Sequence, residues 1–487
     1  MNEIIYSLKE FFASRSIPAY IVGGYLRDNL LGIEVQDFDL VAMSDPIELG
    51  KELANRLNGT LITLDKSRGI VRIVTRPSGK VVDLARFSNS IEEYLSGRDF
   101  SINAMALNLD KSVSDEWCNY LVDPYNGLHD LQENHVKMIS RNVFTDDPLR
   151  LLRAVRIARK CGFAIETQTE RAILHDSSKV SDVSSERIRE EFMQIIAGDG
   201  AADGLRLLDR LGLLSRVIPD LDACRKVSQP KAHYWDVFDH SINAVEAVER
   251  VTSGIKEDIF LSELEYDQDT ESYFEQTISD GHSMRTFLKL AALTHDIAKP
   301  HTKTIDNNGM HFWGHEKKGS EIMEEWLRFM HVGGKGTAAI CLMIKHHLRP
   351  SQLSEPGNIP SSRAIYRFSR DLEELAIAVL FLSLADYMAA KGPMINLLDW
   401  QKKVNLVNNV LGSLRELRLS NIDRPIRRLV SGNDLMKYLD VKPGPKLGLL
   451  LSEIAEANAV NRMANKREAL EWAKAKLTVE GEANCSA

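Results

Sequence analysis

The sequence predicts an α+β fold, in which a small mixed α/β head precedes a long all-helical remainder. Two observations lead to this class. Short apolar, strand-like segments alternate with helix-like stretches only up to about residue 140. From Asp146 onward, apolar residues recur with helical spacing almost to the end of the chain. Strands gathered in one part and helices in the other indicate separate domains rather than a doubly wound sheet.

Three interruptions of the pattern predict the domain boundaries. They lie near residue 140, at 226–233 (KVSQPKAH), where a proline and small polar residues break the helical spacing, and at 391–393 (KGP). A chain of 487 residues has room for about two to four domains. We therefore expect a head over 1–140, a helical neck and body over 141–230, an inserted all-helical domain over 231–392 and a helical tail over 393–487.

Composition excludes some classes of protein and leaves others open. With 44% hydrophobic and 27% charged residues, the chain falls in the range of soluble globular proteins. No apolar run reaches the roughly 18–20 residues that span a bilayer, and the first residues do not resemble a secretion signal. The five cysteines are scattered, which is typical of reduced thiols. We expect a cytoplasmic protein without a membrane partner. The net charge of −8 does not by itself favour a nucleic-acid partner.

Paired carboxylates in the head predict a magnesium site. Asp37 and Asp39 stand two apart in the strand-like DFDLVAM, so both side chains point to one face of a sheet. Two neighbouring carboxylates repel each other unless a cation lies between them, and oxygen ligands suit Mg²⁺. Asp83, in the later strand-like KVVDLARF, could complete the set. Such a set suits two-Mg²⁺, in-line transfer of a nucleotide with departure of pyrophosphate.

A diglycine precedes these carboxylates. Gly23 and Gly24 follow the strand-like AYIV, and their backbone can approach a triphosphate closely, with Arg27 one helical turn further on to pair with it. A lone Asp-x-Asp or a lone Gly-Gly is usually structural. The order strand, Gly-Gly, helix, strand with Asp-x-Asp is what indicates nucleotide chemistry.

A basic helix is predicted beyond the head. The run DDPLRLLRAVRIARKCGF (146–163) has Asp at its start, Pro148 in its first turn and Gly162 as its end. Its arginines recur every three residues and form a stripe nearly free of acids, at Arg150, Arg153, Arg156 and Arg159. The ordinary role of such a stripe is a solvated face. The alternative is a surface that contacts nucleotide.

Histidines and aspartates in the helical middle predict a second metal site. The candidates lie on separate helix-like segments: His240, His295, Asp296 and Asp386. Imidazole and carboxylate groups on buried helices are ligands for a divalent metal, and a buried Asp needs a partner. The identity of this metal stays open. His315, His346 and His347 either add ligands, bind phosphate or are ordinary surface histidines.

The ordered motifs resemble known families. GGYLRD followed by DFDL resembles the nucleotidyltransferases of polymerase-β type. GRDFSINAMA (97–106), DPYNGLHDL (123–131), the basic helix and SSERIREEF (184–192) follow in the order of class II tRNA nucleotidyltransferases, a family that includes CCA-adding enzymes and bacterial poly(A) polymerases. The histidine–aspartate segments are similar to the HD phosphohydrolase superfamily.

The resemblance implies roles for individual residues. Arg98, Asp99 and Asn103 would hold the ribose of the incoming nucleotide. Asp147 and Arg150 would read its base in place of a template, and Arg153 would contact the nucleotide. The substrates would be CTP, ATP and the 3′ end of tRNA. The tail, with SGNDLMKYLDVKPGPKLGLLLSEI (431–454), would hold the tRNA body. In this family the HD module is linked to 2′,3′-cyclic phosphodiesterase and phosphatase activities.

Three departures from the family pattern bear on the product. Asp146 replaces the usual Glu, and Gly97 replaces the usual first Arg of Arg-Arg-Asp. Only ARFSNSIEEYLSG (85–97) separates Asp83 from Arg98, where full CCA-adding members carry a flexible loop. In the family, a missing loop goes with enzymes that add two C residues and leave the final A to a separate A-adding enzyme. We therefore expect CC addition. The alternatives are full CCA addition, poly(A) synthesis, and a hydrolase whose head only binds RNA.

Overall fold

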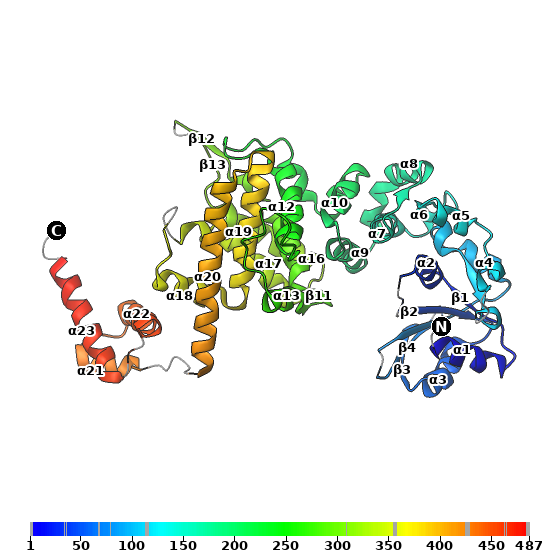
Figure 1. The fold of residues 1–487 in the computed structure, drawn as a ribbon, viewed down its shortest axis with the longest axis horizontal. Coiled ribbons are helices and arrows are strands. Elements are labelled where there is room, and N and C mark those ends of the chain that lie inside the picture. Colours follow the sequence, from blue (N-terminus) through cyan, green and yellow to red (C-terminus); the bar gives the residue numbers. More distant parts are fainter. Residues whose placement is uncertain are drawn as a thin grey trace. The chain divides into compact units, whose positions relative to one another are not determined.

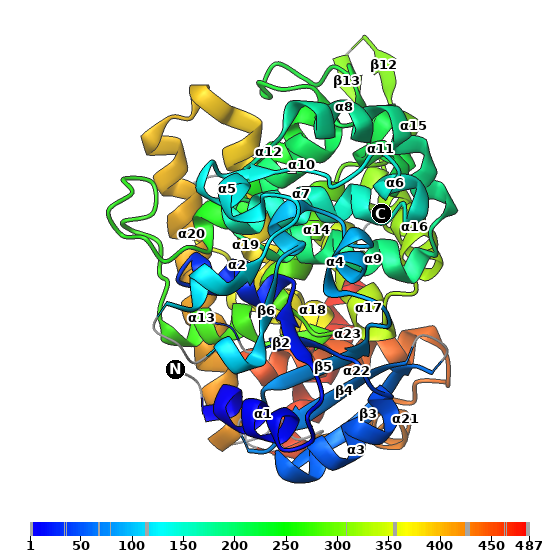
Figure 2. The same ribbon diagram turned by 90° about the vertical axis from the view of Figure 1, so that its right-hand side faces the viewer.

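The computed structural model describes residues 3–483 apart from 34, 36, 67–68, 78, 113–115, 308, 354–357, 424–428, 462 and 464. The chain divides into two compact units, Met1–Pro219 and Asp220–Ala487 (Figures 1 and 2). The main sheet lies in the first unit, and helices make up nearly all of the second. The expected α+β class is therefore confirmed. The finer division into four domains stays a prediction.

A seven-stranded sheet forms the centre of the head. Its strands lie in the order β3-β4-β5-β2-β1-β6-β7, and β2 and β5 form its parallel pair. The strands are β1 (Ala19–Val22), β2 (Asp37–Ala42), β3 (Gly59–Asp65), β4 (Ile70–Thr75), β5 (Val81–Arg86), β6 (Ala106–Asn108) and β7 (Leu121–Val122). The helices of the head are α1 (Glu3–Ala13), α2 (Gly24–Leu30), α3 (Pro46–Arg56), α4 (Ile91–Ser96) and α5 (Gly127–Gln132). Figure 1 shows α3 beside the β3–β4 end of the sheet.

The alternation of side chains along β2 positions the predicted carboxylates. Phe38 is fully buried and stacks on Tyr25 of α2, with ring centroids 4.8 Å apart. Leu40, on the same face of the strand, is buried as well. Because successive side chains of a strand point to opposite faces, Asp37 and Asp39 lie on the other face of the sheet. The burial of Phe38 and Leu40 thus determines the face of the sheet on which Asp37 and Asp39 lie.

A helical neck follows within the first unit. It consists of α6 (Val143–Asp146), α7 (Arg150–Cys161), α8 (Thr167–Asp176), α9 (Ser185–Ala197), α10 (Ala201–Arg210) and α11 (Leu214–Val217), with a two-stranded parallel sheet of β8 (His135–Val136) and β9 (Ala164–Ile165).

The basic helix differs from its prediction at one end. Gly162 ends α7 in the left-handed conformation, with φ 69°, as expected. The start was placed wrongly, because α7 begins at Arg150 and Asp147 is extended, with φ −149° and ψ 99°. Pro148 explains the difference, since the residue before a proline is disfavoured in the helical region.

The second unit contains a bundle built around one buried helix. Its helices are α12 (Val237–Val251), α13 (Gln268–Glu275), α14 (Met284–Thr294), α15 (Lys299–Thr302), α16 (His315–Phe329), α17 (Gly334–His346), α18 (Ser362–Leu372) and α19 (Ala376–Lys391). Two short hairpins, β10 (Thr277–Ser279) with β11 (His282–Ser283) and β12 (Thr304–Asp306) with β13 (Gly309–His311), join some of them. The helix α19 packs on α12 and α14, and Figure 1 shows α19 beside α12.

Further helices complete the second unit. They are α20 (Leu397–Asp423), α21 (Gly432–Leu439), α22 (Pro445–Asn461) and α23 (Lys466–Ala483). A small apolar core around Leu435, Leu450 and Ile454 joins the last three. Arg363 and Arg367 of α18 lie 3.1 Å and 2.9 Å from the buried carboxylate of Glu456 on α22. This ion-pair cluster connects the tail to the bundle.

One stretch, Ser362–Met394, is long and apolar enough to meet a composition test for a membrane span. It contains α19, and 61% of its most apolar window is buried inside the protein. The packing of α19 on α12 and α14 accounts for its apolar character, because a helix surrounded by other helices is apolar on all sides.

Candidate active sites

The three predicted carboxylates of the head come together on one face of the sheet. Asp39 of β2 is the register partner of Asp83 on the parallel strand β5, and Asp37 pairs in register with Val81 two residues earlier. Asp37 is exposed, whereas Asp39 and Asp83 are partly buried. A cation bound between these carboxylates can therefore be reached from solvent beside Asp37 and still contact the partly buried Asp39 and Asp83.

An arginine that the sequence did not single out completes this cluster. Arg72 of β4 donates two hydrogen bonds to Asp83, from Nε to Oδ1 and from Nη2 to Oδ2, each 2.8 Å long. The hydrogen bond to Asp83 and the charges of Asp37 and Asp39 raise the pKa of Arg72. The only sequence signal was a single cation in the apolar strand IVRIVT. Its partner depends on the strand register, which the sequence does not specify.

The diglycine makes room for Asp39. Gly23 has φ 71°, and a Cβ atom there would lie 2.8 Å from Asp39 Oδ2. Burial raises the pKa of Asp39 and the Asp83 charge adds to this, while Arg98, Arg153 and a hydrogen bond from the Gly24 backbone N–H act in the opposite direction. A bound divalent cation would favour the charged form, so the site fits the predicted Mg²⁺.

We expect Gly23→Ala to lower nucleotide addition about 10²-fold, because displacement of a catalytic group by about 1 Å has an effect of this size. Gly32→Ala is the matched control. Gly32 has nearly the same φ, 72°, and apart from its chain neighbours no atom of the described residues lies within 4 Å of its added Cβ. Gly23 also has ψ −140°, outside the left-handed region, so Gly23→Ala is the more strained variant and thermal unfolding of both variants accompanies the comparison of their addition rates. Equal rates would contradict this role of Gly23.

A polar pocket of about 380 Å³ gathers five of the seven other predicted nucleotide-binding residues. Its lining is formed by Tyr94, Gly97, Arg98, Asp99, Asp147, Leu149, Arg150, Arg153 and Arg187. Five of these were predicted from the sequence, although they come from two segments about 50 residues apart. Tyr94 and Arg187 were not among the predicted residues, and Arg187 belongs to the quoted motif SSERIREEF.

Asp99 lines this pocket, and its pKa is lowered although the residue is buried. Burial opposes ionisation, but Arg153, whose Nε lies 2.7 Å from Oδ2, and hydrogen bonds from Asn103 and the Phe100 backbone outweigh it and lower the pKa of Asp99. A carboxylate held in this way can accept a hydrogen bond from a ribose hydroxyl. The contact between Asp99 and nucleotide stays a prediction.

Arg27 is placed behind the pocket rather than at its surface. It is only 5% exposed, and it donates from Nη1 to Asn103 Oδ1 at 2.7 Å and from Nε to Asp28 Oδ1 at 2.7 Å. Lys160 of α7 donates to the other oxygen of Asp28 at 2.8 Å. In this arrangement Arg27 orients Asn103, and through it Asp99.

Two arginines of the basic stripe of α7 pair with acids from other helices. Arg156 pairs with Glu191 at 2.5 Å, and Arg159 pairs with Asp203 at 3.3 Å. The acids come from α9 and α10, so local sequence could not reveal them. Arg150 instead donates to the Gly97 carbonyl at 2.6 Å, which leaves the start of α7 facing the pocket.

At the same end of the pocket, Arg187 lies 2.8 Å from Asp147. The Asp147 carboxylate also accepts a 3.3 Å hydrogen bond from the Leu149 backbone N–H. The acid predicted to read the base is therefore held from two sides.

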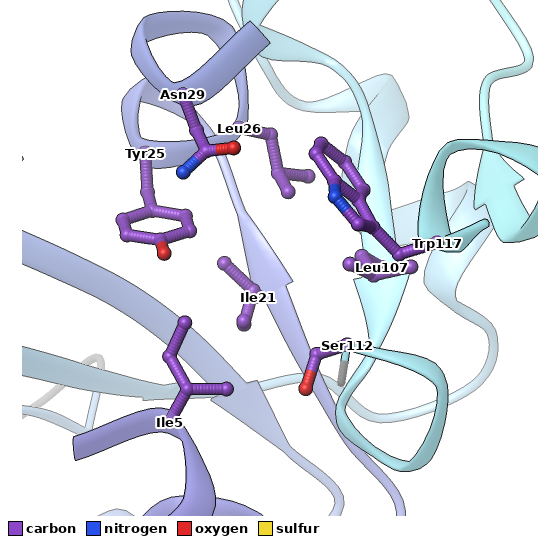
Figure 3. A pocket seen from close by; sticks show the side chains of 8 residues that line it. All are labelled: Ile5, Ile21, Tyr25, Leu26, Asn29, Leu107, Ser112 and Trp117. Atoms are coloured by element: carbon purple, nitrogen blue, oxygen red, sulfur yellow. The ribbon is translucent and has the colours of Figure 1, made fainter. Parts of the chain in front are cut away.

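A second pocket, of about 240 Å³, lies on the face of the sheet opposite Asp37 and Asp39, because its lining residue Ile21 pairs in register with Leu40. Figure 3 shows its lining residues. Mainly apolar side chains line it: Ile5, Ile21, Tyr25, Leu26, Asn29, Leu107, Ser112 and Trp117. The described residues that line it include no charged side chain.

The four predicted metal ligands of the second unit converge. His240 comes from α12, His295 and Asp296 follow α14, and Asp386 comes from α19. The Nε2 atom of His240 lies 3.2 Å from His295 Nε2, 3.3 Å from Asp296 Oδ2 and 3.1 Å from Asp386 Oδ1. The Nε2 atom of His295 lies 3.1 Å from Asp296 Oδ2 and 3.4 Å from Asp386 Oδ1.

These separations fit a metal ion. The centre of a tetrahedron with edges near 3.3 Å lies about 2.0 Å from each corner, which is the usual metal–nitrogen distance. His240, His295 and Asp296 are almost fully buried, whereas the Asp386 side chain is 25% exposed. Asp386 therefore marks the side from which solvent reaches this group. The buried Nδ1 of His240 has no hydrogen-bond partner among the described residues.

The charged forms of His295, Asp296 and Asp386 stabilise one another. Burial opposes protonation of His295, but Asp296 and Asp386 outweigh it and raise its pKa to about 10. Burial also opposes the charges of Asp296 and Asp386, yet the neighbouring histidines, and Lys299 beside Asp296, hold both carboxyl pKa values well below the ordinary value.

The structure separates the two adjacent histidines that the sequence left open. His347 is buried beside His295, with ring centroids 5.0 Å apart, and burial lowers its pKa to about 3. His315 lies against His347 with ring centroids 5.2 Å apart. His346 is only partly buried and lies outside this group.

Models of known families match successive parts of the chain. "Poly A polymerase head domain" matches residues 19–137, and "Probable RNA and SrmB- binding site of polymerase A" matches 162–225. The HD domain matches 237–391, and the tRNA nucleotidyltransferase domain 2 model matches 426–473.

Similar proteins extend over almost the whole length. The A-adding tRNA nucleotidyltransferase of Deinococcus radiodurans is 28% identical over 459 residues, which cover 93% of this chain and 94% of the relative. The CC-adding tRNA nucleotidyltransferase of Thermus thermophilus is also 28% identical, over 93% of this chain and 92% of the relative. Among solved structures, the Thermotoga maritima CCA-adding enzyme complexed with tRNA has a TM-score of 0.59 at 19% identity, over 98% of this chain and 96% of that one.

Proposed function

The chain belongs to the class II tRNA nucleotidyltransferase family, in the form that carries an HD domain, and we propose that it adds C residues to the 3′ end of tRNA and stops before the terminal A. Nucleotide addition to tRNA ends is what the named activities of its relatives have in common. The observation that carries the proposal is the juxtaposition of Asp37, Asp39 and Asp83 on one sheet face of the head, in the unit that also holds the polar pocket.

The residues of the head would have separate roles in nucleotide transfer. Asp37 and Asp39 would hold Mg²⁺, which when bound offsets the negative charge of the transferring phosphate. Gly23 and Gly24 leave space beside Asp39 for a triphosphate. Asp99 and Asn103 would receive the ribose, with Arg27 fixing the position of Asn103.

The connection after β5 supports CC addition. The strand ends at Arg86 and α4 begins at Ile91, so only 87–90 lie between them. Ser90 caps α4 by accepting a 3.1 Å hydrogen bond from the Glu93 backbone N–H, which leaves little slack for a mobile loop. A second candidate is A addition, because the relative from Deinococcus radiodurans carries that name at the same 28% identity as the CC-adding relative.

Asp147 and Arg150 are proposed to select the base. We expect Asp147→Ala to reduce the preference for CTP over UTP about tenfold to a hundredfold, since one well-placed hydrogen-bonding pair contributes about 1–3 kcal/mol of base discrimination. Competition between the two nucleotides on tRNA that lacks its 3′ CCA measures this preference. Asp146→Ala is the control, because its exposed side chain lies one residue away and does not line the pocket. An unchanged preference in Asp147→Ala would contradict its selective role.

The HD domain is proposed to hydrolyse phosphate esters at damaged tRNA ends, such as 2′,3′-cyclic phosphates. His240, His295, Asp296 and Asp386 would hold a divalent metal, which when bound activates water at neutral pH. Partial exposure of Asp386 gives the substrate a route to this group.

A comparison of two RNAs tests the proposed substrate. With CTP, ATP and Mg²⁺ present, a tRNA transcript lacking CCA should be extended by a fixed, short number of residues. An unstructured RNA of the same length should remain unextended. Long A-tracts on both RNAs would instead indicate a poly(A) polymerase and would overturn the proposal.

A further inference from the structure

We propose that the side chains of His311 and Trp313 form a stacking platform for a base of single-stranded RNA, beside the metal group of the HD domain. The metal group consists of His240, His295, Asp296 and Asp386. This inference rests on the proposed hydrolysis of phosphate esters at RNA ends, and it assigns a binding site to the part of the RNA that does not react.

The stacking platform lies where the hairpin of β12 and β13 joins α16, and Figures 1 and 2 show this hairpin projecting from the bundle. His311 is the last residue of β13, and Trp313 follows two positions later. Their ring centroids lie 5.2 Å apart, with an angle of 15° between the ring planes. Trp313 is nevertheless 75% exposed. His311 thus covers one face of the indole ring, and the exposure leaves the other face open to solvent.

The hairpin fixes the orientation of the rings. His311 donates from Nε2 to Asp306 Oδ1 at 3.1 Å, across the two strands, and it pairs in register with Thr304. After Trp313 the chain turns into α16 at Gly314, which has φ 77°. A single exposed tryptophan is ordinary on a protein surface. A tryptophan ring held parallel to a second, anchored ring is preorganised for stacking, because less conformational freedom is lost on binding.

The residue between the two platform residues connects them to the metal group. The Phe312 carbonyl oxygen lies 2.7 Å from His315 Nδ1, and His315 Nε2 lies 3.3 Å from Asp296 Oδ1. Lys299 Nζ lies 5.5 Å from the centroid of the Phe312 ring and 2.6 Å from Asp296 Oδ2. Trp313 and His315 are two residues apart, so their Cα atoms are at most about 7 Å apart. A base stacked on Trp313 therefore belongs to a strand whose end can reach the metal group.

Cations beside the stacking platform favour an anionic partner. Lys317 and Lys318 lie in the first turn of α16, where the positive end of the helix dipole makes a cation unfavourable for the helix itself. Lys317 is exposed, and it forms no hydrogen bond or ion pair with any residue that the structure describes. Lys318 lies 3.5 Å from Glu321, and both side chains are about half exposed. Both lysines are therefore accessible to a phosphate.

The chemistry of the stacking platform indicates unpaired RNA. The acids closest in sequence are already engaged, because Asp306 accepts from His311 and Glu316 lies 3.6 Å from His315 Nδ1. Aromatic rings beside cations are typical of sites that bind single-stranded nucleic acid, where bases stack on the rings and phosphates meet the cations. The bases of a duplex are stacked on one another, so an unpaired end is what offers a free base.

Steady-state hydrolysis of a short single-stranded RNA that ends in a 2′,3′-cyclic phosphate tests the proposal. Trp313→Ala should raise KM about 5- to 100-fold, the effect of losing one stacked base, and leave kcat unchanged. Trp313→Phe should recover most of the loss, because it restores an aromatic face. Phe329→Ala is the matched control, since Phe329 is a 68% exposed aromatic residue at the other end of α16, and it should keep KM.

An RNA with the same phosphates and abasic residues at its end separates stacking from charge. Its KM should be the same for the unaltered chain and for Trp313→Ala. Lys317→Gln should instead weaken the binding of both RNAs and reduce the salt dependence of KM by about 0.7 in the logarithmic slope, which corresponds to one phosphate contact of a single strand. An unchanged KM of the base-containing RNA in Trp313→Ala would overturn the stacking platform and leave the proposed hydrolase intact.

Cross-linking gives a result that does not depend on hydrolysis. RNA carrying 4-thiouridine near its end is irradiated with the full-length chain, and mass spectrometry locates the cross-links, which should include the peptide that contains Trp313. Cross-links there in a chain that hydrolyses no RNA end would overturn the proposed hydrolysis and leave the platform. If Trp313→Ala changed the sedimentation coefficient and not KM, the platform would bind a second copy of the chain, and its assignment to RNA would be wrong.

Thermal unfolding establishes that the variants are folded. The exposed side chain of Trp313 contributes little to the core, so Trp313→Ala and Phe329→Ala should unfold at nearly the same temperature as the unaltered chain.

Discussion

Asp39→Asn should reduce nucleotide addition about 10³-fold, equivalent to about 4 kcal/mol of lost transition-state stabilisation. Asn keeps the shape of the side chain and removes its charge. Asp39 lies beside Gly23 and in register with Asp83, at the centre of the carboxylate cluster. The measurement is single-turnover incorporation of labelled CTP into tRNA that lacks its 3′ end.

The exposed acid Asp45 provides the control for this variant. Asp45 caps α3 by accepting a 2.8 Å hydrogen bond from the Ile47 backbone N–H, away from the carboxylate cluster. Asp45→Asn should therefore keep the rate of CTP incorporation. If Asp39→Asn kept its rate within tenfold of the unaltered chain, the assignment of the site would be wrong.

Asp386→Asn should reduce hydrolysis of a 2′,3′-cyclic phosphate at an RNA end about 10²- to 10³-fold. Asp386 supplies one of two carboxylates to the His240–His295 group, and it is the member that solvent reaches. Its replacement by Asn removes a charge from the metal set without leaving a cavity. Conversion of the labelled 2′,3′-cyclic phosphate at the end of a short RNA to a terminal phosphomonoester, resolved by electrophoresis, measures this reaction.

The two variants serve as controls for each other. Asp386→Asn should leave CTP incorporation unchanged, and Asp39→Asn should leave hydrolysis unchanged, because the two groups lie in separate compact units. Loss of both activities in either single variant would show that the two sites do not act independently.

The sequence allowed much of the head to be predicted, because its chemistry follows short-range periodicity. Alternation along a strand was enough to place Asp37 and Asp39 on one face. The end of α7 at Gly162 followed from the conformational freedom of glycine. The start of α7 differs from its prediction, because Pro148 disfavours the helical conformation at Asp147 and local periodicity does not show this.

Features that depend on tertiary contacts were outside the reach of the sequence. Arg72 grips Asp83 because β4 and β5 pair in one particular register. The acids that neutralise α7 come from residues 35 to 54 positions away in the chain. The distinction between His346 and His347 depends on which of the two faces the bundle at the end of α17. Periodicity alone does not settle which of two adjacent residues is buried at a helix end.

The most direct test of the central claim resolves the products of two tRNA substrates to single nucleotides. One tRNA lacks all three terminal residues and the other ends in CC, and each receives CTP, ATP or both. CC addition predicts that the first tRNA gains two C residues and that the CC-ended tRNA is not extended with A. Addition of a single A to the CC-ended tRNA would contradict the proposed role of the short connection at 87–90.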